Sequence, residues 1–320
     1  MKEGILGKTG IIEIILLLLL LPRLVFAYTF AWLSDVHIEI GKERIVDQEM
    51  RFSLSTTILE NAVRDINENK DIDFVIITGD ILNNGRSWNL DASKFILDKL
   101  NKPYFVVIGN NDFAMPISGI GISKTTFHTA FADNEPNFKG GIWSYSPVKD
   151  LLLIGIDNIN PISGGEAWTE NLMKNLEKHL KSNNRKDVII LVHYPIVELN
   201  YQKNGKLLYS AMEFMDLCKR YKVSFICSGH YHYKEFQKID SIFNFICPAL
   251  IEFPHQYLTV LVSSKEVNIS SHNVLDIITI EESRNKLAGK IRKLLYSYPD
   301  ISEQQILDKM IGKKVYNYAR

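Results

Sequence analysis

Short apolar runs that end abruptly in polar residues recur along this chain. Each run has the length and the β-branched and aromatic content of a buried strand, and the polar residues that follow mark its carboxyl end. The first of these runs ends in Asp35 and, two residues later, His37. The predicted strands cover residues 29–33, 74–78, 104–108, 151–156, 188–192 and 223–228.

Between these runs, apolar residues recur at spacings of three and four, which predicts amphipathic helices. The predicted helices span residues 47–69, 90–100, 166–180 and 212–221. Two later segments, 236–248 and 257–269, have strand composition with no helix between them, and we expect them to complete a sheet. Residues 113–141 are rich in glycine and show little periodicity, so they predict a long surface loop. The alternation of strand and helix places the chain in the α/β class.

The last 41 residues, 280–320, predict a helical tail. Leu287 and Ile291 begin one apolar face, Pro299 interrupts it, and Ser302 with Gln305 forms the pattern of a capping box for a last helix. No catalytic motif falls in this segment. Its basic residues are interpreted as the solvated face of a helix packed on the core, with a partner-binding role left open.

The amino-acid composition limits the kinds of molecule that the protein is expected to bind. The chain has 320 residues, and its 37 basic side chains equal its 37 acidic ones, so no overall charge favours binding to nucleic acid or to an anionic membrane. A small-molecule substrate is favoured. The three cysteines cannot all pair in disulfides, and they are interpreted as buried packing thiols.

The first 27 residues have the pattern of a secretory signal peptide. Lys2 and Lys8 precede the apolar segment Ile11–Leu21, and a small residue, Ala27, offers a cleavage site. Glu13 interrupts the segment, whereas a membrane span needs about 20 uninterrupted apolar residues. We therefore expect cleavage, export to the periplasm or the extracellular space, and no stable membrane span afterwards. The alternative is an uncleaved segment that anchors the protein in a membrane. The predicted organisation is a signal peptide over 1–27, a catalytic domain over 28–279 and the helical tail over 280–320.

Metal-binding residue types gather at the predicted strand ends. Open α/β sheets place their ligands at the carboxyl ends of the strands, so these side chains are expected to converge. Four of the eight histidines are among them. The donors are more than one zinc ion needs and suit two first-row metal ions that share a bridging ligand. The candidate ligands are Asp35, His37, Asp80, Asn110, His193, His230 and His232.

In their order along the chain, these motifs resemble those of the calcineurin-like metallophosphoesterases. The motifs are Asp35-x-His37, Gly79-Asp80, Gly109-Asn110-x-Asp112, His193 and Gly229-His230-x-His232. The resemblance implies a four-layer α/β/β/α sandwich, to which the tail adds a C-terminal helical extension. It further implies that Asp35, His37 and His232 hold one metal ion. Asn110, His193 and His230 would hold the second, and Asp80 would bridge the two.

The same resemblance implies hydrolysis of a small phosphorylated substrate by attack of a metal-bound hydroxide. The cofactors would be two divalent ions, with manganese, iron, zinc and cobalt as candidates. The alternative is a non-catalytic metal-binding scaffold of the same fold that docks partners through its C-terminal helices. The completeness of the ligand set favours the enzyme.

One position departs from the family motif. Asn111 stands where the family has a histidine that is thought to protonate the leaving group, and an amide cannot give up a proton. Phosphodiesters or phosphoanhydrides are therefore favoured over alkyl monoesters, unless a nearby imidazole such as His128 substitutes. Asp80, Asn111 and Asp112 are the candidate catalytic residues. The candidate substrate contacts are Asn110, Asn111 and His255, and Asp157 and Asn158 are assigned a supporting role.

Overall fold

The structure of the protein is a computed structural model. It describes residues 27–41, 50–114, 119–183, 187–196, 209–297, 302–311 and 315–320. The predicted signal peptide therefore lies, up to residue 26, outside the described residues. Within the described ranges, no helix combines the length and the apolar character that a membrane crossing requires.

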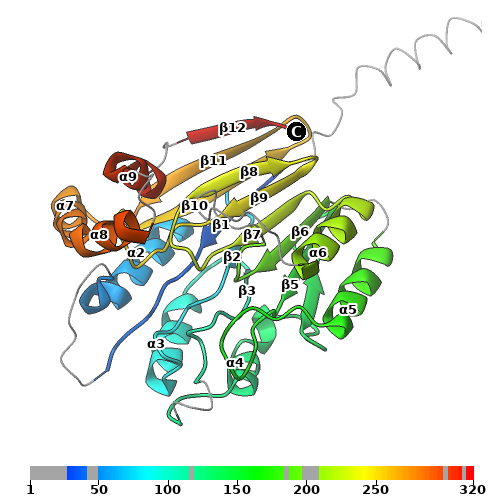
Figure 1. Ribbon diagram of the computed structural model, residues 1–320, viewed down its shortest axis with the longest axis horizontal. Helices are drawn as coiled ribbons and strands as arrows, with labels where there is room; N and C mark the ends of the chain where they lie inside the picture. The colour runs from blue at the N-terminus through cyan, green and yellow to red at the C-terminus, as the bar shows by residue number, and fades with distance from the viewer. Residues whose placement is uncertain are drawn as a thin grey trace, which may run out of the picture.

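Two six-stranded sheets form the centre of the molecule (Figure 1). The first sheet has the order β12-β11-β10-β1-β2-β3 and the second has the order β4-β5-β6-β7-β9-β8. The strands of the first sheet are β1 (Ala27–Leu33), β2 (Phe74–Ile77), β3 (Tyr104–Val106), β10 (Gln256–Ser263), β11 (Glu266–Asn273) and β12 (Val315–Ala319). Those of the second are β4 (Ile142–Tyr145), β5 (Leu151–Ile156), β6 (Asp187–Val192), β7 (Phe225–Ser228), β8 (Glu235–Ile239) and β9 (Ile242–Ile246).

Helices cover the outer face of each sheet. α2 and α3 pack on the first sheet, and α5 and α6 lie outside the second (Figure 1). Together with the two sheets they make the four layers that the family resemblance implies. The helices are α2 (Ser55–Glu68), α3 (Ser87–Leu97), α4 (Lys124–Ala130), α5 (Glu170–Lys181), α6 (Tyr209–Arg220), α7 (Ile277–Lys286), α8 (Ala288–Ser297) and α9 (Glu303–Ile311).

Strand β1 shows why both faces of the central layers are apolar. Successive side chains of a strand point to opposite faces. Phe30 and Trp32 face the second sheet, where they join the core between the sheets. Ala31 and Leu33 face the helices and join the core beneath α2 and α3. A strand buried on both sides needs a continuous apolar run, which is the pattern found in the sequence.

Parallel pairing brings the strand ends together. β1 pairs with β2 and β2 with β3 in parallel, and β5, β6 and β7 are also parallel neighbours. The carboxyl ends of parallel strands meet at one edge of a sheet. The polar residues that follow β1 and β2 therefore meet those that follow β6 and β7.

Several predicted boundaries shift. The helix expected over 47–69 is a short 3-10 turn (Phe52–Leu54) followed by α2, and residues 42–49 lie outside the described part. The segments 236–248 and 257–269 are each parts of antiparallel pairs, β8 with β9 and β10 with β11. The helix expected from residue 166 begins at Glu170, after the Thr169 side chain caps it by accepting a hydrogen bond from the Leu172 amide.

Among the described residues, the prediction of a helical tail is correct as far as Ile311 and wrong for residues 315–319. The last residues form strand β12, which pairs with β11 at the edge of the first sheet. Tyr316 and Tyr318 lie two apart, so both rings reach the same face and pack on the core between the sheets. This period of two is the signal that the prediction overlooked.

Helices α7, α8 and α9 gather at one end of the molecule, and we call them the C-terminal extension (residues 277–311; Figure 1). Their apolar side chains form a separate small core with residues of the body. Its buried members are Tyr233, Phe253, Ile280, Leu287, Ile291, Ile306, Leu307 and Met310. Arg51, in the segment before α2, donates a hydrogen bond to Ser283 of α7 at 3.0 Å. This hydrogen bond also links the extension to the body.

Candidate metal centre

Most of the predicted ligands lie in left-handed backbone just beyond a strand. This conformation is costly for residues other than glycine and is concentrated at functional sites. The strain is offset because backbone hydrogen bonds join one strand end to the next, from the Asp35 amide to the Gly79 carbonyl and from the His37 amide to the Asp80 carbonyl. The ligands with positive φ are Asp35, His37, Asp80, His230 and His232.

Two glycines allow these strand ends to approach one another. A Cβ atom at Gly79 would lie 2.6 Å from Nδ1 of His193, and one at Gly229 would lie 1.9 Å from the Ser34 hydroxyl. Both distances are shorter than any real contact. Each glycine immediately precedes a predicted ligand, so the ligand loops can pack closely only because these positions lack a side chain.

The first group of candidate ligands comprises Asp35, His37 and His232, whose donor atoms lie within 4.8 Å of one another. Nε2 of His232 is 3.3 Å from Oδ1 of Asp35 and 3.4 Å from Nε2 of His37. All three side chains are buried. The Asp35 carboxylate is held in place because it accepts hydrogen bonds from the Ser34 hydroxyl at 2.6 Å and from the His230 amide.

The second group comprises Asp80, His193 and His230, again within 4.8 Å. Nε2 of His193 is 3.4 Å from Oδ2 of Asp80 and 3.1 Å from Oδ1 of Asn110, which brings the predicted amide ligand to this group. His193 is fully buried, whereas His230 is partly exposed. The Tyr194 ring packs against the His230 ring, with 4.1 Å between their centres.

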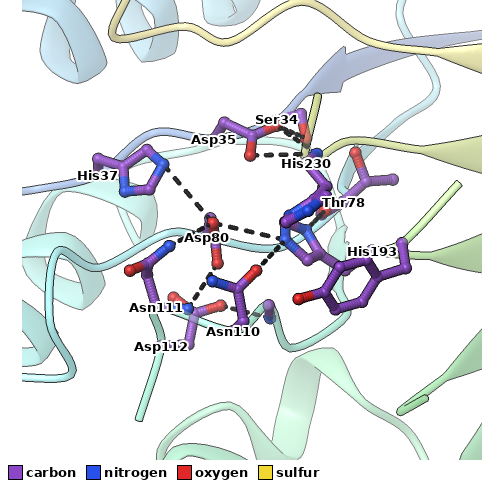
Figure 2. Close-up of polar contacts among 12 residues, drawn as sticks. Ser34, Asp35, His37, Thr78, Asp80, Asn110, Asn111, Asp112, His193 and His230 are labelled. Carbon is purple, nitrogen blue, oxygen red and sulfur yellow. Dashed lines mark hydrogen bonds and ion pairs between the residues drawn. The ribbon is translucent and has the colours of Figure 1, made fainter. Parts of the chain in front are cut away.

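Asp80 lies between the two groups. Figure 2 shows its carboxylate with His37 on one side and His193 on the other. Its Oδ2 atom is 3.6 Å from Nε2 of His37 and 3.4 Å from Nε2 of His193. One carboxylate oxygen thus faces ligands of both groups, which is the placement that a bridging ligand requires.

The directions of the ring nitrogens fit cations. Nδ1 of His193 lies 2.8 Å from the Thr78 carbonyl, which can only accept, so Nδ1 carries the proton in the neutral ring. The Nε2 lone pair then points toward the oxygens of Asp80 and Asn110. Lone pairs that face one another repel unless a cation lies between them. Atoms bound at about 2.1 Å to one ion lie roughly 3.0–3.4 Å apart, close to the separations seen here.

The pKa values also indicate that the carboxylates of the site favour positive charge nearby. Burial opposes charge on His193, but Asp80 raises the pKa of this imidazole to about 9. Burial likewise opposes charge on His232, yet Glu252 and Asp35 raise its pKa to about 10. Burial and the neighbouring His193 lower the pKa of His230 to about 4, which keeps that ring neutral. The carboxylates thus attract positive charge to the site, and divalent cations can provide it in place of protons.

Asn111 and Asp112 hold the Asn110 loop in place in different ways. The Asn111 backbone and side-chain amides each donate a hydrogen bond to the Asp80 carboxylate, both at 2.8 Å. Asp112 is fully buried and accepts hydrogen bonds from the Leu82 and Gly109 amides at 2.8 Å and 2.7 Å. Burial and the nearby Asp80 raise the pKa of Asp112 to about 8. Since backbone amides occupy both of its oxygens, Asp112 is a positioning residue.

His128 belongs to a separate, partly buried cluster. Its Nδ1 lies 2.7 Å from Glu135, its Nε2 lies 3.3 Å from Asp157, and Lys124 donates to Asp157 at 2.7 Å. We call Lys124, His128, Glu135 and Asp157 the His128 cluster. Because carboxylates engage both ring nitrogens, His128 does not substitute for the missing motif histidine, and Asp157 supports this cluster. Asn158 beside it is fully buried.

His255, a predicted substrate contact, is fully buried. Its Nδ1 donates to the Leu250 carbonyl at 3.1 Å, and its backbone amide donates to the Glu252 carbonyl at 2.6 Å. It therefore lies in the wall behind the first group, with no exposed surface to offer a substrate. All three cysteines are buried and unpaired, as predicted.

The sequence analysis missed Glu252. This residue is 1% exposed, and its Oε1 lies 2.8 Å from Nδ1 of His232. Its Oε2 accepts a hydrogen bond from Lys290 of α8. Glu252 follows no apolar strand in the pattern of the other ligands, so only its position before the aromatic-proline segment Phe253-Pro254 distinguished it.

Comparison with known proteins finds a family model that matches most of this chain. Residues 28–234 match the family model described as calcineurin-like phosphoesterase. A curated relative from Xenorhabdus bovienii, described as a probable cyclic nucleotide phosphodiesterase, is 22% identical over 210 residues, which are 62% of this chain and 76% of the relative. A probable glycerophosphodiester phosphodiesterase from Arcobacter nitrofigilis is 29% identical over 204 residues, which are 62% of this chain and 70% of the relative.

Among solved structures, a dimetal phosphatase from Danio rerio has a similar fold. The TM-score is 0.62 at 15% sequence identity, and the superposition covers 78% of this chain and 97% of the other. At this identity the likeness concerns the fold. The matched family segment ends two residues after His232 and leaves Glu252 and the C-terminal extension outside it.

Proposed function

Since the chain belongs to the calcineurin-like phosphoesterases and is a metallophosphoesterase, we propose that it hydrolyses phosphodiesters or phosphoanhydrides in preference to alkyl phosphomonoesters. The observation that carries this proposal is the hydrogen bonding of the Asn111 side chain. Its side-chain amide donates to Asp80 at 2.8 Å, so the residue that replaces the family's histidine is engaged with a candidate ligand. It has no proton to give to a leaving oxygen.

The remaining described imidazoles near this position do not supply the acid. His193 and His230 are candidate ligands, and both nitrogens of His128 face carboxylates. A general acid contributes about 10²–10⁴-fold to the departure of a poor leaving group. Alkyl monoesters should therefore react slowly, while esters and anhydrides with better leaving groups should react faster. The names of the two relatives, both phosphodiesterases, support the same substrate class.

The roles of the remaining residues follow from their positions. When bound, two divalent ions would activate water and neutralise charge on the phosphoryl oxygens. Asp35, His37 and His232 would hold one ion, and Asn110, His193 and His230 the other, with Asp80 bridging them. The Asn111 amides orient Asp80 between the groups, and Asp112 fixes the loop that carries Asn110 and Asn111.

The substrate proposal is tested with one panel of compounds. The full-length protein is supplied in turn with manganese, iron, zinc or cobalt and assayed on bis(nitrophenyl) phosphate, nitrophenyl phosphate, a nucleotide anhydride and glycerol phosphate. We expect the diester or the anhydride to have the highest kcat/KM and glycerol phosphate the lowest. A preference for glycerol phosphate with any of these metals would overturn the proposal.

We also propose that the enzyme is exported and that the mature chain begins at Tyr28. The support is the sequence pattern alone: Lys2 and Lys8, the apolar segment Ile11–Leu21 and the small residue Ala27. Mass spectrometry of the protein from the exported and membrane fractions decides between cleavage and anchoring. An intact Met1 in the membrane fraction would support the uncleaved anchor.

A further inference from the structure

The C-terminal extension contacts the first group of candidate ligands through a series of three charged or ionisable side chains, of which Glu252 and His232 are buried and Lys290 is partly buried. Lys290 of α8 donates to Oε2 of Glu252, and Oε1 of the same carboxylate lies 2.8 Å from Nδ1 of His232. Glu252 is 1% exposed and the Lys290 side chain 16% exposed, so water screens neither contact strongly. On its far side, the His232 ring presents Nε2 to Asp35 and His37.

We propose that Lys290 and Glu252 are positioning residues that set the affinity of the first ligand group for its metal ion. The C-terminal extension therefore contributes to metal binding. The inference rests on the two-metal function proposed above. A carboxylate that accepts a hydrogen bond from the non-ligating nitrogen of a histidine fixes the tautomer and the ring orientation, and makes the other nitrogen a stronger donor. Glu252 is placed to do this for His232.

Lys290 supplies the charged partner that the Glu252 carboxylate requires. A buried carboxylate without such a partner is strongly disfavoured. The Lys290 ammonium offsets this charge and also lies over the Tyr233 ring, 5.4 Å from its centre. The charge balance of the first group thus depends on a residue 58 positions away in the sequence from the ligand it supports.

Packing fixes the relative positions of the segments that carry Lys290, Glu252 and His232. Tyr233 follows His232 and Phe253 follows Glu252, and both are buried in the small core of the extension with Leu287 and Ile291. A buried lysine, Lys234, donates to the Ile311 carbonyl at the end of α9 at 2.9 Å. The extension therefore packs directly behind the loop that carries His232. The second group shows a different support, because Nδ1 of His193 donates to the Thr78 carbonyl within the catalytic body.

The test is a calorimetric titration of the metal-free full-length protein with Mn²⁺, for wild type, Lys290→Met and Glu252→Gln. Lys290→Met keeps the length of the apolar side chain and removes the charge. We expect one of the two Mn²⁺ equivalents to bind about 10–100-fold more weakly in both variants, while the other keeps its wild-type affinity. Lys290→Arg, which restores the charge, should recover most of the loss.

A matched control is Lys286→Met, which removes an exposed lysine one turn earlier in the extension and should leave both equivalents unchanged. The absorption bands of Co²⁺ bound to each variant provide a second readout, since a reoriented His232 changes the ligand field and a merely less stable fold does not. Circular dichroism at the titration temperature verifies that each variant is folded.

Three outcomes would overturn the inference: wild-type affinities at both equivalents in Lys290→Met and Glu252→Gln, equal weakening of both equivalents, or an equal effect of Lys286→Met. A wild-type protein that binds fewer than two Mn²⁺ ions would instead contradict the two-metal proposal. The two failures are therefore distinguishable.

Discussion

Two clusters of this protein combine histidine with carboxylates, but their ring nitrogens face different groups. In the His128 cluster, each ring nitrogen faces a carboxylate oxygen, and Lys124 adds a further positive charge at Asp157. In the candidate metal centre, Nε2 of His37 faces Nε2 of His232 at 3.4 Å, and Nε2 of His193 faces oxygens of Asp80 and Asn110.

The difference lies in where the lone pairs point. With a proton on each ring nitrogen, His128 donates to both of its carboxylate neighbours, so the charges of that cluster balance one another. In the metal centre several lone pairs converge on the same two places, and a proton on one nitrogen cannot satisfy them all. Composition alone does not separate a metal site from an ion-pair cluster, whereas the direction of the ring nitrogens does. The following predictions test this contrast, from the largest expected effect to the smallest.

The largest effect is expected from Asp80→Ala. Because Asp80 faces both groups, its loss should remove more than one metal equivalent and lower kcat/KM by about 10³-fold or more. Metal counting by mass spectrometry and assay of a nitrophenyl diester measure both effects. Asp157→Asn, which alters the carboxylate of the His128 cluster, should retain both ions and nearly full activity. Two tightly bound ions in Asp80→Ala would show that Asp80 does not bridge.

Metal removal should destabilise the fold through the metal centre alone. Ligands that bind only the native state stabilise it, by about 4 kcal/mol when present at a thousandfold excess over Kd. Treatment with a chelator should therefore lower the Tm by roughly 10 °C. His128→Gln should show the same chelator-dependent decrease, measured by scanning calorimetry. A Tm that does not respond to the chelator would mean that cations do not hold the facing ligands together.

Asn111→His should place an imidazole proton donor where this chain has an amide. We expect kcat for glycerol phosphate to rise by about 10²-fold and kcat for nitrophenyl phosphate to change only a few-fold, since nitrophenolate leaves without full protonation. Asn111→Gln, which keeps an amide, serves as the control. If both substrates responded equally, the position would not control protonation of the leaving group.

The smallest effect concerns stability at alkaline pH. Burial opposes charge on His128, but Asp157 and Glu135 raise its pKa to about 9, above the ordinary value of 6.5. A raised pKa stabilises the fold fully below pH 6.5, and this contribution is lost as the pH rises through 9. Urea denaturation with metal present should show the free energy of unfolding falling by about 3 kcal/mol over this window. His128→Gln should lack this part of the decrease, and an equal decrease in both proteins would exclude His128 as its source.

The sequence by itself determined the strands and most of the candidate ligands. Each apolar run is local, and a polar residue directly after a buried strand has only one edge of the sheet to occupy. The positions of Asp35, Asp80, His193 and His230 could therefore be predicted from periodicity, and the structure brings them together. The departure at Asn111 was also visible in the sequence, because it is a single change within a short motif.

Only the tertiary structure decided which distant segments contact one another around the site and at the edge of the first sheet. Glu252 and Lys290 look like ordinary charged residues of a loop and a helix. The role proposed for them comes from contacts between segments that are apart in the sequence, of Glu252 with His232 and of Lys290 with Glu252. The direction of the His128 nitrogens and the placement of β12 against β11 likewise depend on chain segments that no local pattern connects. Apolar periodicity records which face of an element is buried, whereas a charged side chain reveals its role only when its partner is in place.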